Sequence, residues 1–169
     1  MLTIPHILAL GPVIPVIVID DSDKAIPLAE ALLEGGIRTI EITLRTPAAL
    51  DAISAVAGRC PDITIGAGTV NRAELAHQAL DAGATFAVSP GTTQDVISGC
   101  RDAGLPLLPG AATVSEMMTL QDEGFSAVKF FPANPSGGTS FIKALASPLP
   151  GLIVCPTGGI TQDTAPDWL

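Results

Sequence analysis

Aromatic residues, cysteines and histidines are scarce in this chain of 169 residues. Only 4% of the residues are aromatic and none is Tyr, whereas 47% are hydrophobic. The three cysteines, Cys60, Cys100 and Cys155, include no C-x-x-C spacing, and the two histidines, His6 and His77, stand apart from them. The sequence therefore predicts neither a disulfide framework nor a metal site.

Positive charge is also sparse, because eight Lys and Arg are set against seventeen Asp and Glu, for a net charge of −9. Nucleic-acid binding needs clustered cationic side chains, so we expect no nucleic-acid partner. The most apolar stretch, Leu8 to Ile19, is interrupted by one Gly and two Pro. A membrane span needs about 20 apolar residues, so none is expected. Met1–Leu10 has no basic start and no small-residue cleavage site, and we expect a cytoplasmic protein without a signal peptide.

A repeated pattern organises the sequence. Four times, an acidic residue and a Gly close a helical pattern and lead into a short apolar run, within residues 34–43, 81–90, 102–110 and 122–132. The glycine of each repeat stands where a helix end commonly needs a positive φ. Each apolar run has the length and composition of a strand that is buried on both faces of a parallel sheet.

All runs of this kind together predict seven strands, at residues 13–19, 39–44, 63–69, 85–90, 105–110, 127–132 and 152–158. Helical patterns separate them; Thr92 or Thr93 can cap one helix, and Thr113 or Ser115 the next. Alternating strands and helices leave an open doubly wound sheet or a closed barrel. No glycine follows the first strand, which argues against a dinucleotide site, and chemically active residues recur at the ends of several strands, which favours a barrel.

The predicted fold is therefore an α/β (β/α)₈ TIM barrel with seven strands present, in one domain over residues 1–169. A last helix is expected to start near Thr161. Such barrels typically have about 250 residues and seldom fewer than about 200. We therefore expect the domain to be C-terminally incomplete, without the last βα unit, and to have a gap between its seventh and first strands.

Glu41 and Lys129 each stand five positions after the glycine of their repeat. Strand alternation turns the neighbouring Ile40, Ile42, Val128 and Phe130 toward the helices, and so turns Glu41 and Lys129 into the barrel lumen. Their strands, the second and the sixth, have the same parity and lie opposite each other. The narrow lumen then brings the acid and the amine together, or lets one small substrate bridge them.

This pair is a candidate catalytic site. Apolar and aromatic neighbours disfavour the ammonium form of Lys129 and expose a nucleophilic amine. The chemistry that follows is Schiff-base formation with a carbonyl substrate, with Glu41 moving protons. The alternative is a structural salt bridge, which we disfavour because buried ion pairs are often no more stabilising than apolar pairs.

Other candidate residues follow the strands. Arg45, four residues beyond Glu41, can clamp a substrate carboxylate with two hydrogen bonds. Thr69 can donate a hydroxyl to the same site, although a helix-capping role explains it equally well. Gly158 and Gly159 let backbone N–H groups approach an anion, in the loop where barrels often bind phosphate. Spacing alone assigns no chemistry to Ser89-Pro90-Gly91.

Seven motifs occur in order: PVIPVIVI, EITLRT, GAGTV, SPG, LPGAATVSE, KFFPA and CPTGGI. Together they resemble the 2-keto-3-deoxy-6-phosphogluconate (KDPG) aldolases, which often also act on 4-hydroxy-2-oxoglutarate (KHG), over essentially the whole chain. The resemblance implies a class I, metal-independent and cofactor-free aldolase of the Entner–Doudoroff route, a homotrimer that binds phosphorylated keto acids and pyruvate.

The resemblance also implies a role for each matching residue. Lys129 would form the Schiff base and Glu41 would be the general acid/base. Substrate binding would fall to the remaining seven: Arg45 and Thr69 on the pyruvate carboxylate, Pro90 and Phe131 lining the pocket, and Thr157, Gly158 and Gly159 near the distal end.

Two other functions remain open at this point. One is an inactive or weakly active ligand-binding barrel fragment with an incomplete phosphate site. The other is a phosphate-binding isomerase or synthase barrel, which explains Lys129 less well. The sequence does not rank KDPG against KHG.

Overall fold

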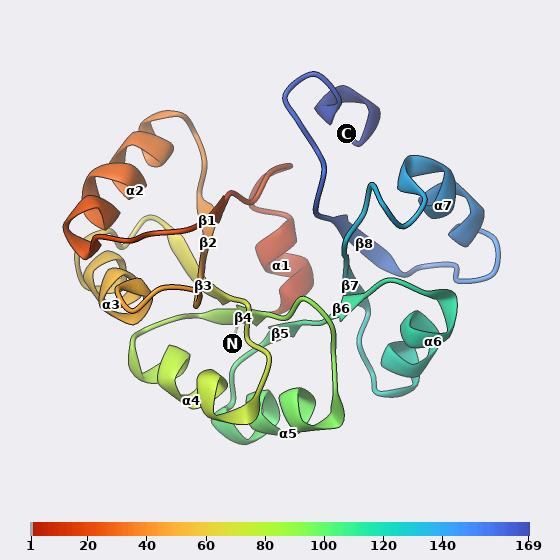
Figure 1. The fold of residues 1–169 in the computed structure, drawn as a ribbon, viewed down its shortest axis with the longest axis horizontal. Helices are drawn as coiled ribbons and strands as arrows, with labels where there is room; N and C mark the ends of the chain where they lie inside the picture. The colour runs from red at the N-terminus through yellow and green to blue at the C-terminus, as the bar shows by residue number, and fades with distance from the viewer. Residues whose placement is uncertain (1) are drawn as a thin grey trace.

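Strands and helices alternate along the computed structural model, which describes residues 2–169 (Figure 1). The strands are β1 (Val16–Ile17), β2 (Thr39–Thr43), β3 (Thr64–Gly68), β4 (Phe86–Val88), β5 (Leu107–Leu108), β6 (Gly110–Ala111), β7 (Ala127–Phe130) and β8 (Ile153–Pro156). The α-helices are α1 (Ile4–Leu8), α2 (Ala25–Glu34), α3 (Ala49–Arg59), α4 (Ala73–Asp81), α5 (Gln94–Ala103), α6 (Val114–Asp122) and α7 (Gly138–Leu145). Two 3₁₀ helices, η1 (Ser22–Lys24) and η2 (Ala165–Asp167), complete the list.

All strand pairs are parallel, in the order β1-β2-β3-β4-β5 and then β6-β7-β8. The predicted strand 105–110 is divided into β5 and β6 by Pro109, which has no N–H to donate to a ladder. The carbonyl of Pro109 accepts a hydrogen bond from Lys129 N at 2.8 Å, so the two groups of strands are joined at this residue. Seven strand positions result, as the sequence predicted.

The strands surround a central axis and the helices α2 to α7 lie outside them (Figure 1). This is the TIM-barrel class of α/β fold. Within residues 2–169, β1 and β8 pair with no strand on their outer edges and not with each other. Valines on the β1 side, Val16 and Val18, are 39% and 51% exposed, and Ile153 on β8 is 42% exposed.

The main core lies between the strands and the outer helices. Ile40 and Ile42 of β2 and Val128 and Phe130 of β7 all belong to it, which confirms the predicted outward direction of these side chains. The ring of Phe130 stacks on Phe141 of α7, with 4.8 Å between ring centroids. Burial of these apolar faces is what fixes the lumen side of each strand.

A second, smaller core lies inside the barrel. Ile4 and Ile7 of α1 pack there against Phe86, Val88, Leu108 and Ala127. Helix α1 lies at the centre of the ring of strands in Figure 1. Five residues carry too little periodicity for the sequence to predict this helix.

Helix ends follow the predicted signals in part. Gly36, Gly83, Gly104 and Gly124 all have a positive φ, between 69° and 96°. Thr93 caps α5, and Thr113 caps α6 in a reciprocal capping box with Glu116. The helix predicted from Thr161 is wrong: hydroxyl groups of Thr161 and Thr164 bond the local backbone, and only the short η2 follows.

Candidate active site

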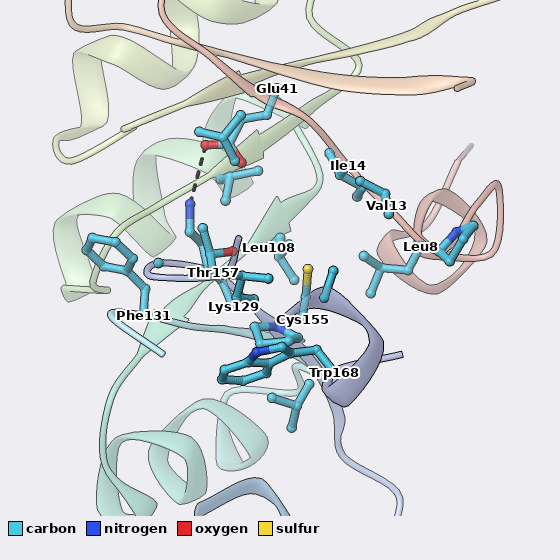
Figure 2. A pocket seen from close by; sticks show the side chains of 18 of the residues that line it. Leu8, Val13, Ile14, Glu41, Leu108, Lys129, Phe131, Cys155, Thr157 and Trp168 are labelled. Atoms are coloured by element: carbon cyan, nitrogen blue, oxygen red, sulfur yellow. Dashed lines mark hydrogen bonds and ion pairs between the residues drawn. The ribbon is translucent and has the colours of Figure 1, made fainter. Parts of the chain in front are cut away.

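Glu41 of β2 and Lys129 of β7 meet inside the barrel, as their strand positions predicted. Nζ of Lys129 lies 3.4 Å from Oε1 of Glu41, and each residue is only 4% exposed (Figure 2). The chain has three lysines, and the other two, Lys24 and Lys143, are exposed. Lys129 is therefore the one lysine whose amine faces an enclosed carboxylate.

Burial raises the pKa of Glu41 above its ordinary value of 4.5. The charges of Lys129 and Arg45 and the hydrogen bond from Lys129 lower the pKa, but burial has the larger effect. A carboxyl with a raised pKa takes up a proton more readily than an exposed one. Glu41 can thus accept a proton from its neighbour and return it.

Arg45 and Thr69 meet above this pair, at the carboxyl ends of β2 and β3. Nε of Arg45 donates a hydrogen bond to Oγ1 of Thr69 at 3.1 Å. Within residues 2–169, the two terminal nitrogens of Arg45 have no protein acceptor. Thr69 has φ 61°, the one positive φ among the described residues other than glycine. A β-branched residue is strained in this region, and such strain concentrates at functional sites.

Phe131 follows β7 and lies beside the amine of Lys129. Its ring centroid is 5.5 Å from Nζ, which is within the range of a cation–π contact. Glu41, Lys129, Phe131 and Thr157 line one cavity of about 740 Å³ (Figure 2). Arg45 lines the same cavity. The charged groups are thus placed at the wall of a space that is large enough for a small substrate.

Gly158 and Gly159 line the same cavity and have φ of 103° and 76°. Two consecutive residues in this conformation leave successive N–H groups on one side of the loop. No acceptor for the N–H groups of Gly158, Gly159 and Ile160 exists in the described part of the chain. A side chain at 159 has no room, because a β-carbon there would lie 2.6 Å from Cβ of Asn134.

Two predicted residues do not line the cavity. Thr69 reaches it only through Arg45, and Pro90 lies half-buried at the end of β4. Pro90 packs instead against Gly110, where a β-carbon would come within 2.5 Å of the Pro90 carbonyl oxygen. The expected contact of Pro90 with the pocket is therefore absent among these lining residues.

Other lining residues had no signal in the sequence. Cys155 of β8 is the register partner of Lys129 and shares its cavity. Burial raises the pKa of the Cys155 thiol; the Lys129 charge opposes this and the Glu41 charge adds to it. Leu8, Val13, Ile14, Ile153 and Trp168 add an apolar wall. These residues reach the cavity because segments that are far apart in the sequence pack together, and short-range sequence patterns carry no information on such packing.

Residues 2–169 contain no group of three or more His, Cys, Asp or Glu side chains placed to hold a metal ion. Across the same residues, none of the helices is both long and apolar enough to cross a membrane. The chemistry of the described site is that of a buried amine and a carboxyl, with a guanidinium and backbone N–H groups nearby.

A barrel that encloses such an amine–carboxyl pair defines a class of Schiff-base-forming lyases, and comparison with known proteins agrees. A family described as KDPG and KHG aldolase matches residues 4–169. A curated relative from Pseudoalteromonas atlantica, 2-dehydro-3-deoxy-phosphogluconate aldolase, is 49% identical over 159 residues, which are 94% of this chain and 74% of the relative. This chain belongs to the KDPG and KHG aldolase family.

Solved structures give the same fold. The KDPG aldolase of Legionella pneumophila, captured with pyruvate as a covalent carbinolamine intermediate, matches with TM-score 0.93 and 44% identity, over 97% of this chain and 80% of the other. The KDPG aldolase of Zymomonas mobilis ZM4 with 3-phosphoglycerate matches with TM-score 0.93 and 44% identity, over 98% and 78% of the two chains.

Proposed function

We propose that this chain is a class I aldolase that cleaves KDPG to pyruvate and glyceraldehyde 3-phosphate and also acts on KHG. The observation that carries the proposal is the 3.4 Å approach of Lys129 Nζ to Glu41 Oε1 in the lumen. Family membership supports it. An inactive ligand-binding barrel is not favoured, because that function does not account for an enclosed amine beside a carboxyl with a raised pKa.

The reaction begins with transfer of the Lys129 ammonium proton to Glu41. The neutral amine adds to the C2 ketone of the substrate and gives a carbinolamine, and loss of water gives the protonated Schiff base. Glu41, directly or through a water molecule, supplies and removes the protons for these two steps. Its raised pKa suits this exchange, because the buried carboxyl takes up a proton more readily than an exposed one.

Carbon–carbon cleavage follows. Glu41 takes the proton of the C4 hydroxyl, the C3–C4 bond breaks, and its electron pair moves into the C2–nitrogen system to form an enamine. Glyceraldehyde 3-phosphate leaves with C4 as its aldehyde carbon. Protonation at C3 converts the enamine to the Schiff base of pyruvate, and water releases pyruvate and restores the Lys129 amine.

Substrate binding falls to the residues around this pair. The terminal nitrogens of Arg45 bind the carboxylate next to C2, since Nε is already engaged by Thr69. The Phe131 ring covers the lysine side of the pocket. Thr157 and the N–H groups of Gly158 and Gly159 receive the phosphate at the distal end.

We infer further that residues 1–169 act as one barrel domain, as a homotrimer, in the cytoplasm and in the Entner–Doudoroff route. Family resemblance supports these inferences. Light scattering after size-exclusion chromatography tests the oligomer, for which we expect three times the mass of the 17.1-kDa chain. A monomer or dimer mass would contradict it.

Borohydride reduction in the presence of pyruvate tests the mechanism. Peptide mass spectrometry should find the reduced pyruvate adduct on Lys129 and on neither Lys24 nor Lys143. Lys129→Arg should abolish both the adduct and KDPG cleavage, whereas Lys143→Arg, a change on the surface, should keep both. Cleavage of KDPG without an adduct on Lys129 would refute the Schiff-base mechanism.

A further inference from the structure

Strand β3 has glycine at both of its lumen-facing positions near the carboxyl end, Gly66 and Gly68, with Ala67 between them turned outward into the main core. Glycine weakens a strand and often marks a close approach of another group. The two glycines have different neighbours. A β-carbon at Gly66 would lie within 2.5 Å of the Phe86 ring, which belongs to the inner core.

Gly68 faces the reactive acid instead. A β-carbon at Gly68 would lie 2.5 Å from Cγ and 2.6 Å from Cδ of Glu41, and closer still to Oε1. Real β-carbons essentially never come within 3.0 Å of such atoms. The Glu41 carboxylate therefore occupies the space that a side chain at position 68 would fill.

The direction of the Glu41 side chain explains this contact. Glu41 pairs in register with Gly66, yet its carboxylate lies against Gly68, which pairs with Thr43. The side chain thus leans toward the carboxyl end of the neighbouring strand. Lys129 is at 3.4 Å from the same Oε1, so the carboxylate is held between Cα of Gly68 and the amine.

To make room for a side chain at position 68, the carboxylate would have to shift into the cavity that Glu41 lines. The side chains of Glu41 and Lys129 are only 5% and 6% exposed. The hydroxyl of Thr43 does not bond the Glu41 carboxylate, because it donates instead to the carbonyl of Ile17 at 2.9 Å. A methyl group at position 68 would therefore displace the carboxylate from Lys129.

We propose that Gly68 is a positioning residue: its missing side chain seats the Glu41 carboxylate against Lys129 in the geometry that proton transfer requires. The proposal rests on the function proposed above. A displacement of about 1 Å in such a site can cost about 10²-fold in rate. The cost should fall on the proton-transfer steps, and much less on substrate binding, which uses Arg45.

Gly68→Ala tests the proposal. We expect kcat for KDPG to fall about 10²-fold, with KM little changed and with loss of pyruvate methyl-proton exchange in D₂O. Equilibrium trapping of pyruvate on Lys129 by borohydride should persist. A Gly68→Ala enzyme with unimpaired kcat and wild-type exchange of the pyruvate methyl protons would overturn the proposal. Borohydride trapping of pyruvate on Lys129 in that enzyme would still support the aldolase mechanism.

A double-mutant cycle separates positioning from a general defect of the strand. In a Glu41→Ala background the space is vacant, so adding Gly68→Ala should cost no further activity and no stability. Gly66→Ala is the matched control on the same strand, and its destabilisation by Phe86 should remain in the Glu41→Ala background.

The cycle also covers a Gly68→Ala chain that does not fold. Recovery of folding in the Gly68→Ala/Glu41→Ala chain supports the proposal, because only the carboxylate then stood in the way. If the double variant loses as much activity or stability as the two single losses combined, Gly68 does not act through Glu41 and the proposal fails.

Discussion

Nζ of Lys129 lies 3.4 Å from Oε1 of Glu41, although 88 positions separate these residues in the sequence. They come from strands that are not neighbours in the sheet, so the pair spans the barrel lumen. An amine and a carboxyl that are both buried lose much hydration, and their mutual contact offsets part of that cost. Each residue therefore helps to hold the other in position, and the charge of Lys129 lowers the pKa of Glu41 against the larger effect of burial.

Replacement of the Glu41 carboxyl by an amide of the same size should separate Schiff-base formation from proton transfer. Glu41→Gln retains the shape of the side chain but cannot exchange a proton. We expect kcat for KDPG cleavage to fall by about 10²- to 10⁴-fold, while equilibrium borohydride trapping of pyruvate on Lys129 survives. Steady-state kinetics and peptide mass spectrometry measure the two effects. If trapping and cleavage were lost equally, Glu41 would only hold the Lys129 amine in place and would not act in proton transfer.

The raised pKa of Glu41 gives a signature in stability against pH. Burial raises the folded-state pKa above the ordinary 4.5, so the contribution of Glu41 is fully present below that value and is lost as pH rises through the folded pKa. The free energy of unfolding of the wild type, minus that of Glu41→Gln, should therefore fall with rising pH. Urea unfolding between about pH 4 and pH 8 measures this difference. A difference that rises over the same window would contradict burial as the dominant cause.

Much of this site could be predicted from the sequence because two short-range rules suffice for it. Alternation along a strand placed Glu41 and Lys129 in the lumen, and the count of repeats placed their strands opposite each other. The glycine that closes each repeat and the cap at Thr113 are local signals of the same kind. Such rules depend on neighbours in sequence, which a single chain displays directly.

The remaining features depend on contacts between distant segments. A glycine within a strand, such as Gly68, indicates that another group lies close to the backbone. The sequence does not show that this group is the Glu41 carboxylate. Cys155 enters the site through its register with Lys129. The position of Thr69 at a positive φ opposes its own intrinsic preference. The packing of α1 inside the barrel likewise depends on a cavity that the other strands form.

A substitution at Thr39 should stabilise the protein. Its Oγ1 is buried and is the one buried side-chain polar atom without a hydrogen-bond partner among the described residues. Thr39→Val removes the unsatisfied hydroxyl and keeps the β-branched shape, so we expect a gain of about 1 kcal/mol in the free energy of unfolding. Thr43→Val is the matched control on the same strand, because the Thr43 hydroxyl donates to Ile17, and it should lose about 1 kcal/mol. Urea unfolding compares both, and a loss at Thr39 equal to that at Thr43 would refute the prediction.

Helix α1 should contribute to stability from inside the barrel. Ile7 is 1% exposed and packs in the inner core with Phe86 and Leu108. Ile7→Ala leaves a cavity there and should cost about 2–5 kcal/mol, as buried Ile and Leu truncations do. Leu10→Ala, at a side chain that is 37% exposed, should change stability by less than about 0.5 kcal/mol. Similar effects at both positions, measured by thermal or urea unfolding, would mean that α1 does not pack inside the barrel in solution.

The bond between Arg45 and Thr69 should set the affinity for the substrate carboxylate, independently of backbone strain at Thr69. Thr69→Val keeps the β-branched shape but removes the acceptor of Arg45 Nε, and a hydrogen bond to a charged group contributes about 1.5–3 kcal/mol. We therefore expect KM for KDPG to rise at least about 10-fold, with trapping of pyruvate still possible at high concentration. Thr69→Ser keeps the hydroxyl and should keep KM near the wild-type value.

Thr69→Gly completes the series, because glycine adopts φ 61° without strain. It should show the same increase in KM as Thr69→Val. Its free energy of unfolding should nevertheless be about 1 kcal/mol higher than that of Thr69→Val, because the valine variant retains the strained left-handed conformation. Affinity would then follow the hydroxyl and stability would follow the backbone. If Thr69→Ser raised KM as much as Thr69→Val, the hydroxyl would not be the group that orients Arg45, and the left-handed turn itself would carry the effect.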